Sequence, residues 1–366
     1  SDSRRQIFLF NPINDQLVEV PHCSGPLQRV LWDDIDQNVF AILQDQELHV
    51  YVYASVSVDG PRVHYNGVTR VRPVEAVPVS ITRGRLLYKL KDGSLDTSML
   101  HTHKHIEGPP SREFGKEKLQ TQYEAYMNLL QFGPAAKCAA LLENNQLTEK
   151  LADAALRHLE VERAISFYRL SGNVSMVLTL EQILNIEDKN LIAGHIVVLL
   201  DGDYAAAQEL FMKSPYPRAA LDMRKDMKQW REALELAEDL APEELPEICR
   251  EYGGLLEMQG SAEARDFYQR ALDYPERDTS QDRVCHAGIA RATVQMGDSA
   301  RGKQLALDSN DPQLCRECAV LLEEQHNFQE AAELYEEVKM YEKAVSLHMQ
   351  TKSFGQAQAL MKHVRA

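Results

Sequence analysis

The sequence lacks any apolar run long enough to cross a bilayer. Its longest apolar candidate, Ile196-Val-Val-Leu-Leu200, is far shorter than the roughly 20 residues that a membrane-spanning helix needs. We therefore expect a soluble chain without direct membrane insertion. The chain begins with Ser1-Asp2-Ser3 rather than Met and carries no signal-peptide pattern, so we expect a piece of a larger protein.

Basic residues are scarce in most of the chain. Of 40 Lys and Arg and 55 Asp and Glu, residues 1–110 hold 11 and 13, which leaves 29 and 42 for the remainder. Sequence-independent nucleic-acid binding depends on neutralising phosphates with Lys and Arg, and anionic lipids attract the same side chains. The charge balance argues against both, so we expect protein partners and no nucleic acid.

The motifs of common enzymes are missing. The chain has no phosphate-binding P-loop, no dinucleotide-binding glycine motif, no nucleophile elbow and no HExxH zinc motif. His158, His195, His286 and His326 lie in separate helical patterns. Because no nucleophile, base and orienting group occur as a set, we predict that the chain is not an enzyme and needs no cofactor.

Cysteine is sparse, with six in 366 residues and no secreted disulfide framework, which indicates a reducing compartment. Cys315 and Cys318 have the CxxC spacing of a metal or redox site, but no second pair follows. We interpret both as buried packing thiols and keep zinc or redox chemistry as the alternative.

Three histidines, His101, His103 and His105, alternate with Thr and Lys at the end of a strand-rich region. On a strand, residues two apart share a face, so a metal site is one hypothesis. We favour a polar strand end that leads into a linker, because no carboxylate or cysteine cluster accompanies them.

Short runs of β-branched and aromatic residues, separated by turn residues, predict strands before residue 101. They are residues 7–10, 17–20, 30–32, 39–43, 48–53, 85–90 and 94–100. A unit of four strands from Leu27 to about Arg70 has the size of a propeller blade, and a shorter unit follows from Val74 to His101. The first two strands are expected to form the outer half of a preceding blade. These incomplete blades cannot close a ring, because propellers usually have about 4–8.

Helical periodicity takes over after Pro110. Helices are predicted at residues 113–131, 135–143, 147–158, 161–171, 174–184, 189–200, 204–213, 218–225, 229–239, 243–258, 262–272, 282–296, 299–307, 312–324, 328–338, 341–350 and 354–363. We expect partial WD-repeat β-propeller blades in residues 1–106, a linker in 107–112 and a tetratricopeptide-like α-solenoid in 113–366.

An aromatic-x-x-Ala phrase recurs in the helical region. It opens three helices only 13 residues apart at the C-terminal end, with earlier and degenerate copies. A small side chain lets neighbouring helices approach closely, and the aromatic one turn before it fills a groove. The predicted repeat anchors are Ala164, Tyr204, Ala207, Trp230, Ala233, Ala264, Phe328, Ala331, Tyr341, Ala344, Phe354 and Ala357.

The junctions between helices also have a pattern. Gly202-Asp203 and Gly297-Asp298 predict a left-handed helix end followed directly by the N-cap of the next helix.

The segments between the anchors resemble a family of WD-repeat subunits of the intraflagellar transport complex A. The resemblance covers most of the chain from Ile7 onward and is most specific in the helices. The matching blocks run from His158 to Ile183, Ile186 to His195, Ala219 to Met227, Gln229 to Ala233 and Glu333 to Ala344.

In that family, WD-repeat propellers precede a tetratricopeptide-like solenoid and a zinc-binding end. The resemblance implies a structural scaffold that supports retrograde ciliary transport and the ciliary entry of membrane-protein cargo. Its implied partners are the other complex A subunits, with cargo or its adaptors bound indirectly, in the cilium or flagellum, the basal body and the cytoplasm. A coatomer-like vesicle coat and a tetratricopeptide cargo adaptor with an acidic face are the alternatives. No metal-binding role passes to Cys315 or Cys318.

Overall fold

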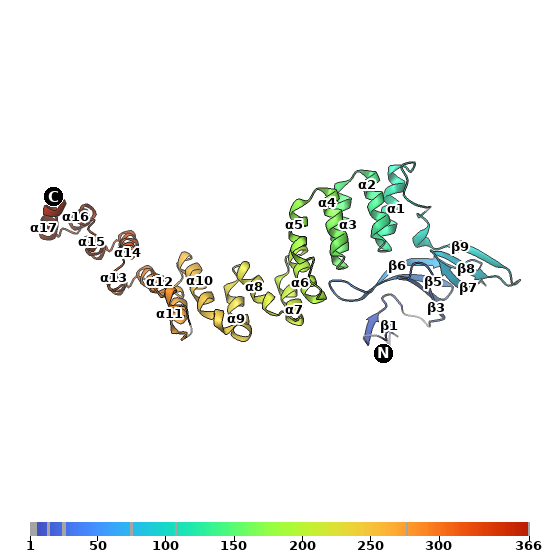
Figure 1. The fold of residues 1–366 in the computed structure, drawn as a ribbon, viewed down its shortest axis with the longest axis horizontal. Helices are drawn as coiled ribbons and strands as arrows, with labels where there is room; N and C mark the ends of the chain where they lie inside the picture. The colour runs from blue at the N-terminus through green and yellow to red at the C-terminus, as the bar shows by residue number, and fades with distance from the viewer. Residues whose placement is uncertain are drawn as a thin grey trace. The chain divides into compact units, whose positions relative to one another are not determined.

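The structure is a computed structural model that describes residues 6–12, 15–23, 27–73, 76–106, 108–275 and 277–364. It divides into two compact units, Ser1–Tyr216 and Pro217–Ala366. The described strands and the helices α1 to α7 belong to the first unit, and α8 to α17 belong to the second (Figure 1). Val74, the start of the predicted shorter blade, and Glu107, the start of the predicted linker, lie outside the described residues.

The described strands form three antiparallel sheets, each in chain order. The sheets are β1 (Phe8–Asn11) with β2 (Gln16–Glu19); β3 (Arg29–Trp32), β4 (Val39–Gln44), β5 (Glu47–Ala54) and β6 (Arg62–Arg70); and β7 (Val77–Thr82), β8 (Arg85–Lys89) and β9 (Leu95–Met99). The predicted grouping into a two-stranded start, a four-stranded unit and a shorter unit is confirmed.

Strand β7 was not among the predicted runs, because it contains a proline. Pro78 has no N–H to donate, and the register with β8 shifts between Pro78 and Ser80. The strand lies at the edge of its sheet, where proline is tolerated. The Pro78 carbonyl accepts a hydrogen bond from Arg29 Nη1 at 2.6 Å, which ties β7 to the four-stranded sheet.

A buried carboxylate joins the second and third sheets. Asp33 is only 2% exposed, and its two oxygens accept four backbone N–H groups: from Ile35 at 2.9 Å, Asp36 at 3.0 Å, Arg83 at 2.9 Å and Gly84 at 2.7 Å. Burial alone would raise the pKa of Asp33, but the backbone N–H bonds outweigh it and hold this pKa below its usual value. The ionised side chain therefore fixes the β7–β8 turn to the end of β3.

The helical part contains one observed helix for each predicted one. The helices are α1 (Lys116–Asn128), α2 (Phe132–Leu142), α3 (Asn145–Arg157), α4 (Val161–Ser171), α5 (Val174–Ile183), α6 (Lys189–Leu200), α7 (Tyr204–Lys213), α8 (Arg218–Asp226), α9 (Trp230–Leu240), α10 (Leu245–Met258), α11 (Ala264–Asp273), α12 (Asp282–Gln295), α13 (Ser299–Asp308), α14 (Pro312–Glu324), α15 (Phe328–Glu337), α16 (Tyr341–Gln350) and α17 (Phe354–Val364). The predicted restart at Ala135 is too late, because Pro134 lies in the first turn of α2, where no N–H is needed.

Most junctions between helices contain one residue in the left-handed conformation. After α15, the left-handed residue Lys339 (φ 59°) donates its N–H to Glu336, and the next residue, Met340, donates to Tyr335 at 2.8 Å. Met340 is at the same time the N-cap of α16. Three residues therefore end one helix and start the next, which gives a 13-residue period when the helix has ten residues.

The predicted Gly-Asp junctions are confirmed. Gly202 (φ 63°) and Gly297 (φ 89°) are left-handed, and the side chains of Asp203 and Asp298 accept N–H groups of the following helices. Other junctions place a non-glycine residue in the same position, including Leu159.

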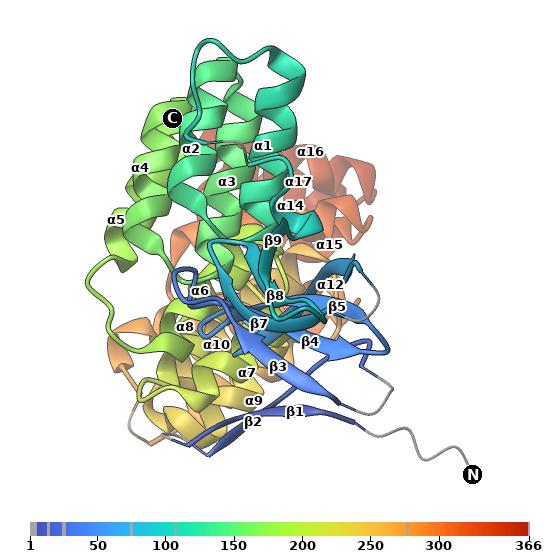
Figure 2. The ribbon, with the colours of Figure 1, turned by 90° about the vertical axis from the view of Figure 1, so that its right-hand side faces the viewer.

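Helices α1 to α5 lie side by side in the first unit (Figures 1 and 2). The end of α3 reaches the loop between β5 and β6, where the Val58 N–H donates to the Arg157 carbonyl at 2.9 Å. Leu129, just after α1, belongs to the apolar core of the blades. The turn after α1 thus packs on the core of the blades.

Candidate protein-interaction site

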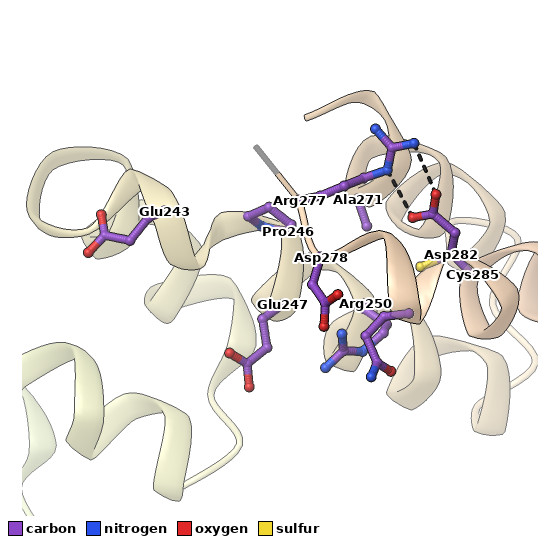
Figure 3. A pocket seen from close by; sticks show the side chains of 10 residues that line it. Glu243, Pro246, Glu247, Arg250, Ala271, Arg277, Asp278, Asp282 and Cys285 are labelled. Carbon is purple, nitrogen blue, oxygen red and sulfur yellow. Dashed lines mark hydrogen bonds and ion pairs between the residues drawn. The ribbon is translucent and has the colours of Figure 1, made fainter. Parts of the chain in front are cut away.

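The second unit contains a polar cavity of about 420 Å³ (Figure 3). It lies where the 3-10 turns η2 (Pro242–Glu244) and η3 (Thr279–Gln281) meet α10, α11 and α12. Its lining residues are Glu243, Pro246, Glu247, Arg250, Ala271, Arg277, Asp278, Gln281, Asp282 and Cys285. Charged and polar side chains dominate this list, so the cavity suits polar groups.

One side of the cavity is closed by a two-pronged ion pair. Arg277 Nε and Nη2 lie 2.9 and 3.0 Å from the two carboxylate oxygens of Asp282, as Figure 3 shows. Arg277 Nη1 also donates to the Tyr274 carbonyl at 3.0 Å. The hydrogen bonds that Arg277 donates to Asp282 raise the pKa of Arg277. Both partners are fixed by these bonds, so this pair serves structure.

The other side carries charges that are less firmly bound. Arg250 has a side chain that is 19% exposed and pairs with its neighbour Glu251 at 3.2 Å. Asp278 accepts the Ser280 N–H and hydroxyl, and these bonds lower its pKa. Glu247 is exposed and forms no ion pair with any residue that the structure describes.

Cys285 contributes a thiol to the lining of this cavity. Burial raises the pKa of the Cys285 thiol above its usual value, so this sulfur stays protonated near neutral pH. No base lies within hydrogen-bond distance of Cys285 among the described residues. The arrangement provides carboxylates and guanidinium groups for contacts with a protein surface.

The predicted anchors do not line this cavity. Every predicted alanine is at least 98% buried, with exposed fractions of 0% for Ala164, Ala207, Ala233, Ala264, Ala331 and Ala344 and 2% for Ala357. In all but one of the copies the alanine is the fourth residue of its helix and donates the first N–H bond to the N-cap carbonyl; Ala264, which begins α11, is the exception.

The predicted aromatic anchors are the first residues of their helices and are less buried. Tyr204, Trp230, Phe328 and Tyr341 are half-buried, whereas Phe354 is 59% exposed. The structure brings Ala331 and Ala344 into one core cluster, with Phe328 packed against it. It places Ala233 and Ala264 in other clusters. The role of all twelve as repeat anchors stays a prediction.

The three histidines do not form a strand end. Strand β9 ends at Met99, and His101–His103 form a 3-10 turn, so residues two apart no longer share a face. His103 is 4% exposed, its ring packs on Gly84, and its Nε2 lies 3.8 Å from an Asp36 oxygen. Nowhere in the described ranges do three or more His, Cys, Asp or Glu side chains gather as a metal site would require.

The two CxxC cysteines lie inside α14. Cys315 and Cys318 are 3% and 0% exposed, which confirms their predicted burial. The Cys315 thiol donates to the Ala306 carbonyl at 3.3 Å, and burial raises the pKa of Cys318 to about 12.

Sequence reasoning missed a partly buried ion-pair network. Arg291 on α12 lies 2.5 Å from one oxygen of Glu257 on α10 and 3.0 Å from Glu317 on α14, and the Tyr268 hydroxyl donates to Glu257 at 2.8 Å. These residues are 26 or more positions apart except for Tyr268, so no helical spacing in the sequence marks them as partners.

In the ranges that the structure describes, none of the helices is both long and apolar enough to cross a membrane.

Known proteins match different parts of the chain. The family described as "WDR19 second beta-propeller" matches residues 1–103. WD repeat-containing protein 19 from Homo sapiens is 34% identical over 332 residues, and the Mus musculus protein is 33% identical over the same length. The WD repeat-containing protein dyf-2 of Caenorhabditis elegans is 29% identical over 343 residues. Each match covers 90% of this chain, and the chain spans 24% of the length of these relatives.

Solved structures with helical repeats are also similar. A tetratricopeptide repeat protein from Parabacteroides merdae covers 69% of this chain and 99% of its own, at 14% identity and a TM-score of 0.24. The TPR2AB domain of yeast Sti1, solved as a complex with pHSP90, covers 68% of this chain and 96% of its own, at 15% identity and a TM-score of 0.21.

The similarity to WD repeat-containing protein 19 extends across both the sheets and the helices, because it covers 90% of the chain. The chain therefore belongs to the family of WD repeat-containing protein 19.

Proposed function

We propose that this chain is part of a scaffold subunit of the intraflagellar transport complex A. In this role it supports retrograde ciliary transport and the ciliary entry of membrane-protein cargo through protein contacts. The observation that carries the proposal is the match to WD repeat-containing protein 19 over 90% of the chain. The partners are the other complex A subunits, and the places of action are the cilium, the basal body and the cytoplasm.

The domain roles follow from the order of the elements. Residues 1–106 act as WD-repeat blades, residues 107–112 as a linker and residues 113–366 as a tetratricopeptide-like solenoid. The sheets at the start of the chain and the uninterrupted series α1 to α17 support this assignment. Scaffolds of this kind present long surfaces to other subunits and perform no reaction themselves.

Affinity purification of the intact protein tests the proposal. We expect recovery of the other complex A subunits in constant proportion after washing at physiological salt. The same protein carrying Ala344→Trp is the matched variant, because it disturbs one helix contact and leaves the strands unchanged. Recovery of coatomer subunits in place of complex A would overturn the proposal in favour of a vesicle coat.

A further inference from the structure

We propose that a groove across α12, α13 and α14 binds a short segment of a partner protein with an acidic residue, an apolar residue and a basic residue in series. The groove has a volume of about 320 Å³, at the small end of the usual range for binding pockets. Its lining residues are Arg283, His286, Ala287, Ile289, Leu305, Asp308, Ser309, Asp311 and Leu314. The inference does not depend on which complex the chain joins.

The floor of the groove is apolar. Leu314 on α14 is 3% exposed and belongs to the core of the second unit. Ala287 and Leu305 pack against the same core and are half-buried, as is Ile289. This floor can take one apolar side chain from a partner and remove it from water, which is the main favourable term in protein association.

The wall formed by α12 is basic. Arg283 is exposed and forms no ion pair with any described residue. His286, one turn later, is also exposed, with its ring Nδ1 2.8 Å from the Asp282 carbonyl oxygen. An acidic side chain of a bound segment would meet a free guanidinium group here.

The opposite wall is acidic. Asp308 is the last residue of α13 and accepts a hydrogen bond from Gln304 at 2.8 Å through one oxygen. Asp311 is the N-cap of α14 and accepts the Gln313 N–H at 2.9 Å, also through one oxygen. Each carboxylate retains a second oxygen that a basic side chain can reach.

The two walls do not neutralise each other. Within the described ranges, no ion pair joins Arg283 to Asp308 or Asp311. In the cavity of Figure 3, by contrast, Arg277 and Asp282 are already paired. The groove therefore carries charges of both signs that are not paired with each other beside an apolar floor, and a segment with the complementary order of charges satisfies both.

Selection from a random twelve-residue peptide library, displayed on phage and presented to the intact protein, tests this inference. We expect the enriched peptides to place a Leu, Met or Phe between an acidic and a basic residue. We also expect their affinity to fall as ionic strength rises, because both contacts are exposed ion pairs.

Two charge reversals probe the walls without loosening the helices. Asp308→Lys puts a cation at the C-terminal end of α13, and Arg283→Glu puts an anion in the first turn of α12, both of which helix dipoles favour. Each should weaken the selected peptide by about fivefold, the effect of about 1 kcal/mol for one exposed ion pair. Reversal of the matching charge in the peptide should restore the lost affinity.

Arg316→Glu is the control, since Arg316 is exposed on α14 and does not line the groove. It should leave affinity unchanged, whereas Ala287→Phe should abolish binding by filling the floor. A library that yields no common charge order overturns the inference. Equal affinity of the selected peptides for wild type and both charge reversals does so too, whether or not Ala287→Phe folds.

Discussion

The ring of Tyr268 limits which residues can occupy the helix positions packed against it. Its ring lies so close to the backbone of α12 that a Cβ at Gly288 would come within 2.3 Å of the ring. A Cβ at Gly254 on α10 would lie 3.5 Å from the Tyr268 hydroxyl, which is an ordinary contact distance. A side chain at Gly288 would therefore clash with the ring, whereas one at Gly254 would have room.

Gly288→Ala should lower the free energy of unfolding by about 1–3 kcal/mol, because the new methyl group must displace the Tyr268 ring in a close-packed interior. Thermal or urea denaturation measures the change. Gly254→Ala is the matched control and should raise stability by about 0.5–1 kcal/mol, since its Cβ makes ordinary contact and alanine favours helix. If both variants behave alike, the ring does not pack as described.

Asp33→Asn should cost about 2–3 kcal/mol, because an amide nitrogen cannot accept the N–H groups that the carboxylate oxygens now accept. The folded pKa of Asp33 is lowered, so its contribution is complete above the unfolded value of 3.8 and is lost as the pH falls through the folded pKa. Denaturant midpoints at a series of pH values should therefore converge for wild type and variant in acid. A constant difference down to the lowest pH would contradict this role.

At the scale of the elements, the junction after α15 explains both the 13-residue period of the helices and a local loss of stability. Lys339 adopts a left-handed conformation (φ 59°) that disfavours residues with a Cβ. Lys339→Gly should raise the free energy of unfolding by about 1 kcal/mol. Arg316→Gly, in the exposed interior of α14, should lower it by about the same amount. Chemical denaturation of both variants measures these changes. Opposite signs for the two variants show that the gain comes from the left-handed conformation at Lys339 and not from glycine as such.

Ala344→Trp should destabilise the contact between α15 and α16 by about 1–3 kcal/mol or more, because Ala344 is 0% exposed and the interior has no space for an indole. The measurement is the melting temperature. An unchanged value would show that the helix can rotate this position into solvent.

The helices could be predicted from sequence because their signals are local. Apolar periodicity and junction residues such as Gly297 and Asp298 act within one turn, and every predicted helix has an observed counterpart. Strand β7 was missed because a proline such as Pro78 is typical of turns in a sequence. The strand is defined by its pairing with β8, which the sequence does not show. The His101–His103 turn was mistaken for a strand end because alternation in sequence does not fix backbone geometry.

The candidate site could be predicted much less than the fold. Buried alanines recur as the fourth residue of several helices, and their spacing in the sequence makes them recognisable, as for Ala331 and Ala344. The groove residues Arg283 and Asp308 come from different helices and have no common spacing. Which charges remain unpaired depends on side-chain positions in three dimensions, and periodicity carries no information on these.

At the scale of the whole molecule, the two compact units have separate cores. In helical arrays each repeat contacts chiefly its neighbours, so a local defect opens nearby elements first. Gly288→Ala should therefore accelerate amide hydrogen exchange in α10 to α14 and leave the amides of β4 and β5 unchanged. Equal acceleration in the strands would show that the chain opens as one cooperative body.

The shared junction of Lys339 and Met340 has a consequence for how this stretch can change through evolution. Val338, Lys339 and Met340 both end α15 and start α16, with no further residue between the two helices. A single residue inserted into or deleted from α15 or α16 would rotate every later side chain of that helix by about 100°. Length variation among descendants of this segment should accordingly occur as gain or loss of whole thirteen-residue units.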